Sequence, residues 1–393
     1  MKKQFNRVLC AVLAVTGIML CGCEKLGTEI VDLMIIQGIA IDVEDNGYYV
    51  CVQTLNNAQS SFSNGENKAE QPSLQYHSRG DTIAEALERA VTVSGKEPLY
   101  AHNKIIRRGE KAAKKGLGDI LDFFVRDYNT RPNVPLAVAR GTTAQSVIEA
   151  KIEKDLITSE VIEDIINRSN IFGRAVQSRV LDTVNLSKEP TSSVCLPVVT
   201  VKDDGEYKEL AADGTAVFDK DNKLKGYLDE EQTFGLMLVN EKTDKGVFNV
   251  TTSDGEKATL VIESISTHVK AYVNERDVPC FDVVIKASCD INEYLSKYES
   301  QLNAQALQRI KEAAAKKITE LARDATQASQ KKLGCDCFRF GRRLWFSERK
   351  VFESAKDRWD EHYANAVINT EARVTIRRVG EESFFRKEPT DKA

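Results

Sequence analysis

The longest periodic segment of the chain runs from Ile291 to about Lys332, and it predicts one long amphipathic helix. Apolar residues recur in it at spacings of three and four, which places them on one face of a helix of roughly ten turns. The residues on this face are Leu295, Tyr298, Leu302, Ala306, Ile310, Ala314, Ile318, Leu321 and Ala325. A coiled-coil arm is one use of such a helix, but its many alanines favour close packing on a β-sheet.

Alternating apolar and polar residues on both sides of this helix predict the strands of such a sheet. Two long strands, Leu260–Val273 and Phe281–Cys289, precede the helix. A strand from Ile368 to Ile376 follows it, after a further helix that is indicated over Trp345–His362. The second half of the chain therefore combines long strands with helices.

The first half of the chain also mixes strands and helices. Ile30–Ile41 and Tyr48–Gln53 predict one β-hairpin, and Gly214–Phe218 with Leu224–Leu228 predict another. Helices are predicted from Asp81 as N-cap, and over Glu110–Val125, Thr143–Ile152 and Ser159–Ser169. The chain is thus expected to be an α+β protein of several domains, with mixed sheets and packed helices. We expect an N-terminal α/β region over residues 31–200, a C-terminal α+β region over residues 208–380 and a polar tail over residues 381–393.

The first 23 residues predict an export signal that ends in a lipid anchor. Three basic residues precede an apolar run that ends at Leu20. This run is shorter than the ~20 apolar residues that a membrane-spanning helix needs. The sequence Leu20-Cys21-Gly22-Cys23 then matches the bacterial lipobox, whose cysteine is acylated. We therefore predict a lipoprotein signal peptide over residues 1–22, lipid attachment at Cys23 and a short tether over residues 23–30.

Charge and cysteine content narrow the classes of function. The full sequence has a formal net charge of −4, and removal of the basic signal peptide makes the mature chain more negative. A net negative chain argues against nucleic-acid binding and against electrostatic attachment to an anionic membrane. Six cysteines follow Cys23, which are too few for a disulfide scaffold, and their pairing is not readable from the sequence. They are Cys51, Cys195, Cys280, Cys289, Cys335 and Cys337.

The sequence shows no local motif for catalysis, for a cofactor or for a metal. It has no Walker A loop, no nucleotide-binding glycine motif and no His-Glu-x-x-His. The segment from Asp219 to Glu230 resembles an EF-hand loop only at its ends, because Lys223 and Leu224 stand where an oxygen ligand and glycine are needed. Cys335-Asp336-Cys337 favours packing or a local disulfide over a metal site. We therefore expect no enzyme activity, no cofactor and no bound metal.

Several ordered segments resemble one known family, the Ger(x)C lipoproteins, which are the C subunits of spore germinant receptors. The resemblance covers nearly the whole mature chain, and it rests on the order of the segments rather than on any single motif. The segments are Gly38-Ile39-Ala40-Ile41-Asp42, Ala101-His102-Asn103-Lys104-Ile105-Ile106, Gly116 with Leu121–Asp127 and Arg131, Gly214–Phe218, Lys223–Gly226, Thr233-Phe234-Gly235, Trp359 and the terminal strand up to Gly380. The cysteines on both sides of Asp336 depart from the family pattern.

The resemblance implies a non-catalytic, lipid-anchored subunit that is needed for nutrient-triggered spore germination. It further implies integral membrane partners, the A and B subunits, and a location on the outer face of the spore inner membrane. A stand-alone solute-binding lipoprotein is the alternative, but the chain shows no pair of similar lobes around a cleft.

Two groups of residues carry sequence-based expectations about individual sites. Arg126, Asp127 and Arg131 are candidates for partner contact, because a helix end with fixed charges suits the polar rim of an interface. Pairing of these three charges with one another is the competing interpretation. His102 is expected in a short strand, as a structural histidine.

Overall fold

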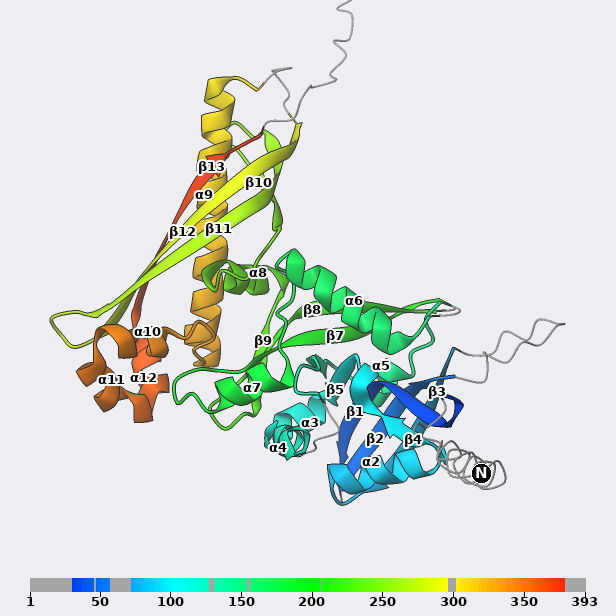
Figure 1. Ribbon diagram of the computed structural model, residues 1–393. Coiled ribbons are helices and arrows are strands. Elements are labelled where there is room, and N and C mark those ends of the chain that lie inside the picture. The colour runs from blue at the N-terminus through cyan, green and yellow to red at the C-terminus, as the bar shows by residue number, and fades with distance from the viewer. Residues whose placement is uncertain are drawn as a thin grey trace, which may run out of the picture.

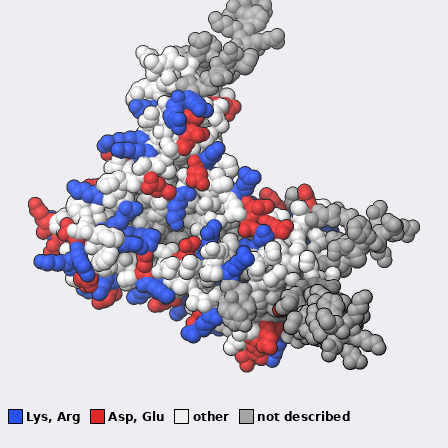
Figure 2. Space-filling view, viewed as in Figure 1, with Lys and Arg blue, Asp and Glu red and all other residues white. Residues whose placement is uncertain are grey.

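The computed structural model describes residues 30–45, 47–56, 72–126, 131–153, 156–205, 207–295 and 302–378. Within these residues the chain forms two β-sheets with helices packed on them (Figure 1). Figure 2 shows that Lys and Arg are interspersed with Asp and Glu on the same face of the molecule. This confirms the predicted α+β class with mixed sheets. The predicted signal peptide, Cys23, most of the tether and the polar tail lie outside the described residues.

The first sheet has the order β3-β2-β1-β5-β6-β7-β8-β9, with β4 paired to β1. Its inner strands β1, β5, β6 and β7 run parallel, and the strands toward both edges are antiparallel. The strands are β1 (Leu33–Glu44), β2 (Gly47–Leu55), β3 (Ser73–Gly80), β4 (Glu97–Leu99), β5 (Ile105–Gly109), β6 (Leu136–Ala139), β7 (Cys195–Asp204), β8 (Tyr207–Phe218) and β9 (Leu224–Leu228).

Helices cover both faces of this sheet. Buried residues of α2, α4 and α7 share a core with one face, and buried residues of α5 and α6 pack on the other. The period of two explains the division, since Ile39 and Ile41 of β1 face the first core while Ala40 faces the second. The helices are η1 (Ile30–Asp32), α2 (Ile83–Thr92), η3 (Tyr100–His102), α3 (Glu110–Lys115), α4 (Gly118–Arg126), α5 (Ala144–Ile148), α6 (Thr158–Ile171) and α7 (Val180–Ser187).

The second sheet has the order β10-β11-β12-β13 and supports the long helix α9. Figure 1 shows α9 running along this sheet, with α10, α11 and α12 gathered at one end. The strands are β10 (Val247–Thr251), β11 (Lys257–Val273), β12 (Pro279–Leu295) and β13 (Val367–Ile376). The helices are α8 (Glu230–Val239), α9 (Ala304–Gln327), the π-helix η4 (Ala328–Leu333), α10 (Phe340–Ser347), α11 (Arg349–Ala355), η5 (Lys356–Arg358) and α12 (Trp359–Asn365).

The long helix is confirmed, but it begins later than the sequence pattern predicts. Ile291–Leu295 belongs to β12, where Leu295 pairs with Lys257 of β11. Within α9 the predicted apolar face is buried from Ala306 to Ala325 and packs on the second sheet. The apolar residues at the end of β12 happen to continue the helical spacing, which is why the pattern alone placed the start too early.

Other element boundaries also differ from the prediction. The N-cap of α2 is Thr82, whose hydroxyl accepts a hydrogen bond from the Glu85 N–H. The predicted helix Glu110–Val125 is two helices, because Gly116 adopts a φ of 131° that a helix cannot contain. The predicted helix Trp345–His362 is likewise divided, among α10, α11, η5 and α12.

The two sheets meet through β8 and β9. The predicted hairpin of β8 and β9 is present in antiparallel register, and Val217 and Leu228 contribute to the core of the second sheet. β7 and β8 also pair as a hairpin, so the first sheet continues through residues 200–208. The domain division at these residues stays a prediction. No helix in the described part of the chain has the length and apolar character needed to cross a membrane.

Candidate functional site

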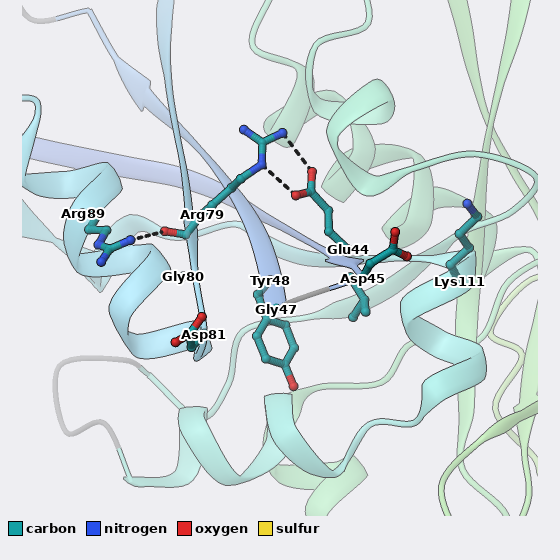
Figure 3. A pocket seen from close by; sticks show the side chains of 10 residues that line it. Glu44, Asp45, Gly47, Tyr48, Arg79, Gly80, Asp81, Arg89 and Lys111 are labelled. Atoms are coloured by element: carbon teal, nitrogen blue, oxygen red, sulfur yellow. Dashed lines mark hydrogen bonds and ion pairs between the residues drawn. The ribbon is translucent and has the colours of Figure 1, made fainter.

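A first large hollow lies where the β1–β2 hairpin meets the end of β3 (Figure 3). It has a volume of about 740 Å³. Three of its charged residues contact one another: Arg79 donates to both Glu44 oxygens at 2.7 and 3.0 Å, and Arg89 Nη1 donates to the Arg79 carbonyl at 3.1 Å. The hydrogen bond from Arg79 lowers the pKa of Glu44. These contacts hold the hairpin to β3.

The second hollow has a volume of about 720 Å³. It lies between α7 and β7, which belong to the part of the fold built on the first sheet, and α8 and α10, which belong to the part built on the second sheet. Arginines dominate its charge. Arg342 Nη1 lies 2.7 Å from a Glu189 oxygen, and Arg339 pairs with the same carboxylate. Arg343 is half-buried and makes no ion pair within the described residues, and burial lowers its pKa. The hollow therefore presents positive charge at the junction of the two parts.

Asp336 fastens the C-terminal helices to one another beside this hollow. Its side chain is 1% exposed, and it accepts the backbone N–H groups of Phe338, Phe340 and Gly341 and the Trp359 indole N–H at 2.8 to 3.1 Å. Burial raises the pKa of Asp336 to about 6, although the backbone N–H groups lower it in part. A carboxylate that is buried from solvent and fully hydrogen-bonded holds the surrounding backbone in place and is not free to react with a substrate.

The cysteines beside Asp336 contact the first sheet. The Cys337 thiol donates to the Cys335 carbonyl at 3.5 Å, and its interaction with the Cys195 thiol of β7, together with burial, raises the pKa of Cys337 well above its ordinary value. Burial raises the pKa of Cys335 to about 12. All six cysteines in the described residues are free thiols, so the local disulfide considered for Cys335 and Cys337 is not formed there.

The predicted partner-contact residues lie at the end of α4. Arg126 Nε donates to Asp122 Oδ1 at 2.8 Å, and these side chains are 77% and 63% exposed. Arg131 is exposed, and Asp127 lies outside the described residues. The ion pair of Arg126 is therefore with its own helix, and the predicted role of the three residues in partner contact stays a prediction.

The Gly38–Asp42 segment has a structural role. A Cβ on Gly38 would lie 2.0 Å from Ser159 Oγ and 2.7 Å from Arg107 Nη2, so only glycine fits there. Asp42 accepts the N–H groups of Ala144 and Gln145, both at 2.9 Å, and thereby caps α5. The segment therefore fastens β1 to α5 and lets β1 pack closely against α6.

Two further sequence-based expectations concern exposed side chains. His102 lies in η3 rather than in the expected strand, and it is exposed. Asp219 Oδ1 accepts the N–H groups of Asp221 and Lys223 at 3.0 and 2.9 Å, so the oxygen of the EF-hand-like loop closes a turn.

The structure also brings together three possible metal ligands that sequence spacing did not indicate. Cys51, His77 and Glu149 present ligand atoms within 4.8 Å of one another. They lie on β2, on β3 and at the end of α5. Only strand register and helix packing bring residues so far apart in the sequence to one point.

Two family models together span almost all of the described fold. "Spore germination protein N-terminal domain" matches residues 27–201, and "Spore germination B3/GerAC like, C-terminal" matches residues 213–380. The chain belongs to the GerAC-like family of spore germination proteins. This confirms the resemblance drawn from the sequence, and it assigns the chain a germination-related role.

Individual spore germination proteins match the chain over nearly their whole length. The chain is 27% identical to spore germination protein KC of Bacillus subtilis (strain 168), over 95% of this chain and 96% of that protein. It is 21% identical to spore germination protein GerQC of Bacillus cereus, over 93% and 97% respectively. The crystal structure of the GerBC protein matches with a TM-score of 0.58 at 18% identity, over 86% of this chain and 96% of that chain, and it shows that the fold is shared.

Proposed function

We propose that the chain is a lipid-anchored, non-catalytic subunit of a spore germinant receptor, and that nutrient-triggered germination requires it. The observation that carries this proposal is the end-to-end match to spore germination proteins through both parts of the fold. The proposal adds to the family's role in germination that this chain acts as one subunit of a receptor complex.

Lipid on Cys23 supplies the anchor in this proposal. Residues 24–30 can span at most about 25 Å, because an extended chain covers ~3.3–3.6 Å per residue. A lipid at Cys23 would therefore hold the first sheet within that distance of the membrane, on the outer face of the spore inner membrane. The A and B subunits, as integral membrane proteins, would be the partners that the first sheet meets there.

The contacts of the charged side chains support a role in protein binding rather than in catalysis. In the first hollow, Glu44 and Arg79 hold the β1–β2 hairpin to β3, Arg89 holds α2 to β3, and Asp336 is sealed from solvent elsewhere in the fold. The end of α4, in contrast, exposes Arg126 and places Val125 beside it with 59% of that residue exposed. An apolar residue beside an arginine is a combination that suits a protein interface.

The proposal can be tested in spores that carry no copy of the chain, the wild-type chain, or a chain with Arg126→Glu, Asp127→Lys and Arg131→Glu. Spores without the chain should fail to respond to the nutrient, and the wild-type copy should restore the response. The charge-reversed chain should slow germination and recover less of the membrane partners. Its melting temperature should barely change, because an exposed ion pair of this kind contributes about 0.3–0.5 kcal/mol.

Arg358→Glu provides the matched control, since Arg358 is also an exposed arginine, with 70% of its side chain accessible, but lies in η5 of the second part. Germination should be normal with this variant. A large fall in the melting temperature of the α4 variant would assign its charges to stability. Normal germination with that variant would remove them from the interface, and normal germination without the chain would contradict the proposed function. A stand-alone solute-binding lipoprotein would leave the A and B subunits out of any purified complex.

A further inference from the structure

We propose that Cys51, His77 and Glu149 form a binding site for a zinc ion at the outer edge of the first sheet. This inference concerns a ligand site and goes beyond the proposed role in a receptor complex. It rests on the way in which β2, β3 and α5 place three different donor atoms around one point.

Strand register creates the first half of the site. β2 and β3 pair in antiparallel register, and Cys51 stands directly opposite His77. Side chains of directly opposite residues lie on the same face of the sheet, with Cβ atoms ~4.5–5.5 Å apart. The thiol and the imidazole are therefore held together by the sheet itself, and they do not depend on a flexible loop.

The end of α5 supplies the third donor. Glu149 is the C-cap of α5, and its Oε1 lies 3.4 Å from His77 Nδ1. In a tetrahedral zinc site with bonds of about 2.0–2.3 Å, two ligand atoms lie about 3.3–3.8 Å apart. The His77–Glu149 pair already has this separation, and all three donor atoms lie within 4.8 Å of one another. Side-chain adjustments of about 1 Å would complete the coordination.

The donor set selects the kind of ion. A thiolate, an imidazole nitrogen and a carboxylate oxygen are all zinc ligands, and three protein ligands leave a fourth position for water. Magnesium and calcium prefer sites made only of oxygen atoms. The combination of sulfur, nitrogen and oxygen therefore favours zinc over these hard cations.

The residues around the proposed site leave it open to solvent on one side and orient its ligands. Cys51 is fully buried at the base, whereas the side chains of His77 and Glu149 are 45% and 31% exposed, so an ion can enter from solvent. Gln145 Nε2 donates to both Glu149 oxygens at 3.0 and 3.1 Å, and the Tyr49 ring stacks on His77 with 6.2 Å between centroids. Such outer contacts fix the direction of metal ligands.

The buried Arg107 guanidinium lies near the Cys51 thiol and affects its ionisation. Arg107 has 0% exposure, and Ser159 Oγ accepts from its Nη2 at 2.8 Å. Burial raises the pKa of Cys51 to about 12. The charge of Glu149 adds to that rise, and the charge of Arg107 opposes it. The charge of Arg107 also repels a metal ion, and the negative charges of the Cys51 thiolate and of Glu149 offset this repulsion in the proposed bound site. A polar contact accounts for the approach of His77 to Glu149, and packing with Ala40, Ala144 and Ile148 accounts for the burial of Cys51. Neither accounts for the convergence of all three donor atoms on one point.

The test uses the full-length chain purified in mild detergent and mixed with one equivalent of zinc sulfate. After desalting, elemental analysis should give about one zinc per chain, and cobalt in place of zinc should produce a sulfur-to-cobalt charge-transfer band. His77→Ala and Glu149→Gln, which change partly exposed side chains, should each weaken zinc binding by ~10-fold or more. Cys51→Ala should abolish both the zinc and the cobalt band.

His268→Ala and Cys289→Ala are matched controls, because His268 is an exposed strand histidine and Cys289 a buried strand cysteine in the second sheet. Both variants should bind zinc like the wild-type chain. The proposal is overturned if the wild-type chain retains no zinc, or if His77→Ala and Glu149→Gln retain as much as the wild type. A cobalt complex that lacks the sulfur band would also exclude Cys51 as a ligand.

Discussion

Replacing Asp336 by alanine should destabilise the protein by about 3 kcal/mol or more, since each buried donor that loses its partner costs about 1–3 kcal/mol. The change removes the acceptor for three backbone N–H groups and for the Trp359 indole N–H, all inside the packed C-terminal helices. Urea unfolding of residues 30–393, followed by circular dichroism, measures the effect. Asp221→Ala is the control, because Asp221 lies in an exposed turn, and it should change stability by less than ~0.5 kcal/mol.

The loss of stability caused by Asp336→Ala should depend on pH. Burial raises the pKa of Asp336 from 3.8 to about 6, so the folded state holds this proton more tightly than the unfolded state. The stability that this group contributes is therefore greatest below pH 3.8, falls as the pH rises to about 6 and is constant above that. The difference in unfolding free energy between the wild type and Asp336→Ala should be larger at pH 4 than at pH 7. An equal difference at the two pH values would show that folding does not raise the pKa of Asp336, and a small difference at both would show that this carboxylate does not hold the helices together.

Replacing Cys23 by alanine should release nearly all of the protein from membranes or leave its signal peptide uncleaved. Cys23 is the cysteine that the lipobox pattern designates for acylation. A single acyl chain of myristoyl length binds membranes only marginally, whereas two chains hold stably, and a diacylglyceryl group supplies two. Membrane fractionation and the mass of the mature protein measure the outcome.

Cys21→Ala is the matched control for the anchor, because Cys21 lies in the same signal but precedes the cleavage point. This variant should be processed and anchored like the wild type. Wild-type fractionation together with wild-type mature mass in the Cys23→Ala variant would disprove lipid attachment at that residue.

Local periodicity predicted much of the fold, and its errors have physical causes. The β8–β9 hairpin follows from two alternating segments around a polar turn, and the buried face of α9 follows from helical spacing. The start of α9 was misplaced because Ile291 and Leu295 of β12 happen to fit that spacing. The break between α3 and α4 depends on the φ angle of Gly116, which a helical pattern of apolar residues does not reveal.

The candidate sites were less accessible to sequence reasoning, because they depend on contacts between distant segments. The sequence Cys335-Asp336-Cys337 suggested a role for its two thiols. In the structure, the carboxylate of Asp336 between them accepts hydrogen bonds from the backbone of α10 and from Trp359 of α12. The group of Cys51, His77 and Glu149 requires the register of β2 with β3 and the packing of α5 on the sheet. Alternation predicted β2 and its pairing with β1, but not its second partner β3 or the register between β2 and β3.

The most direct test of the receptor-subunit proposal is to capture the tagged chain from detergent-solubilised spore membranes and to identify the co-purifying proteins by mass spectrometry. The proposal predicts two integral membrane proteins in amounts close to that of the chain, and their loss when an unrelated tagged lipoprotein is captured instead. Recovery of the wild-type chain alone, at normal abundance and under conditions that preserve other membrane complexes, would contradict it.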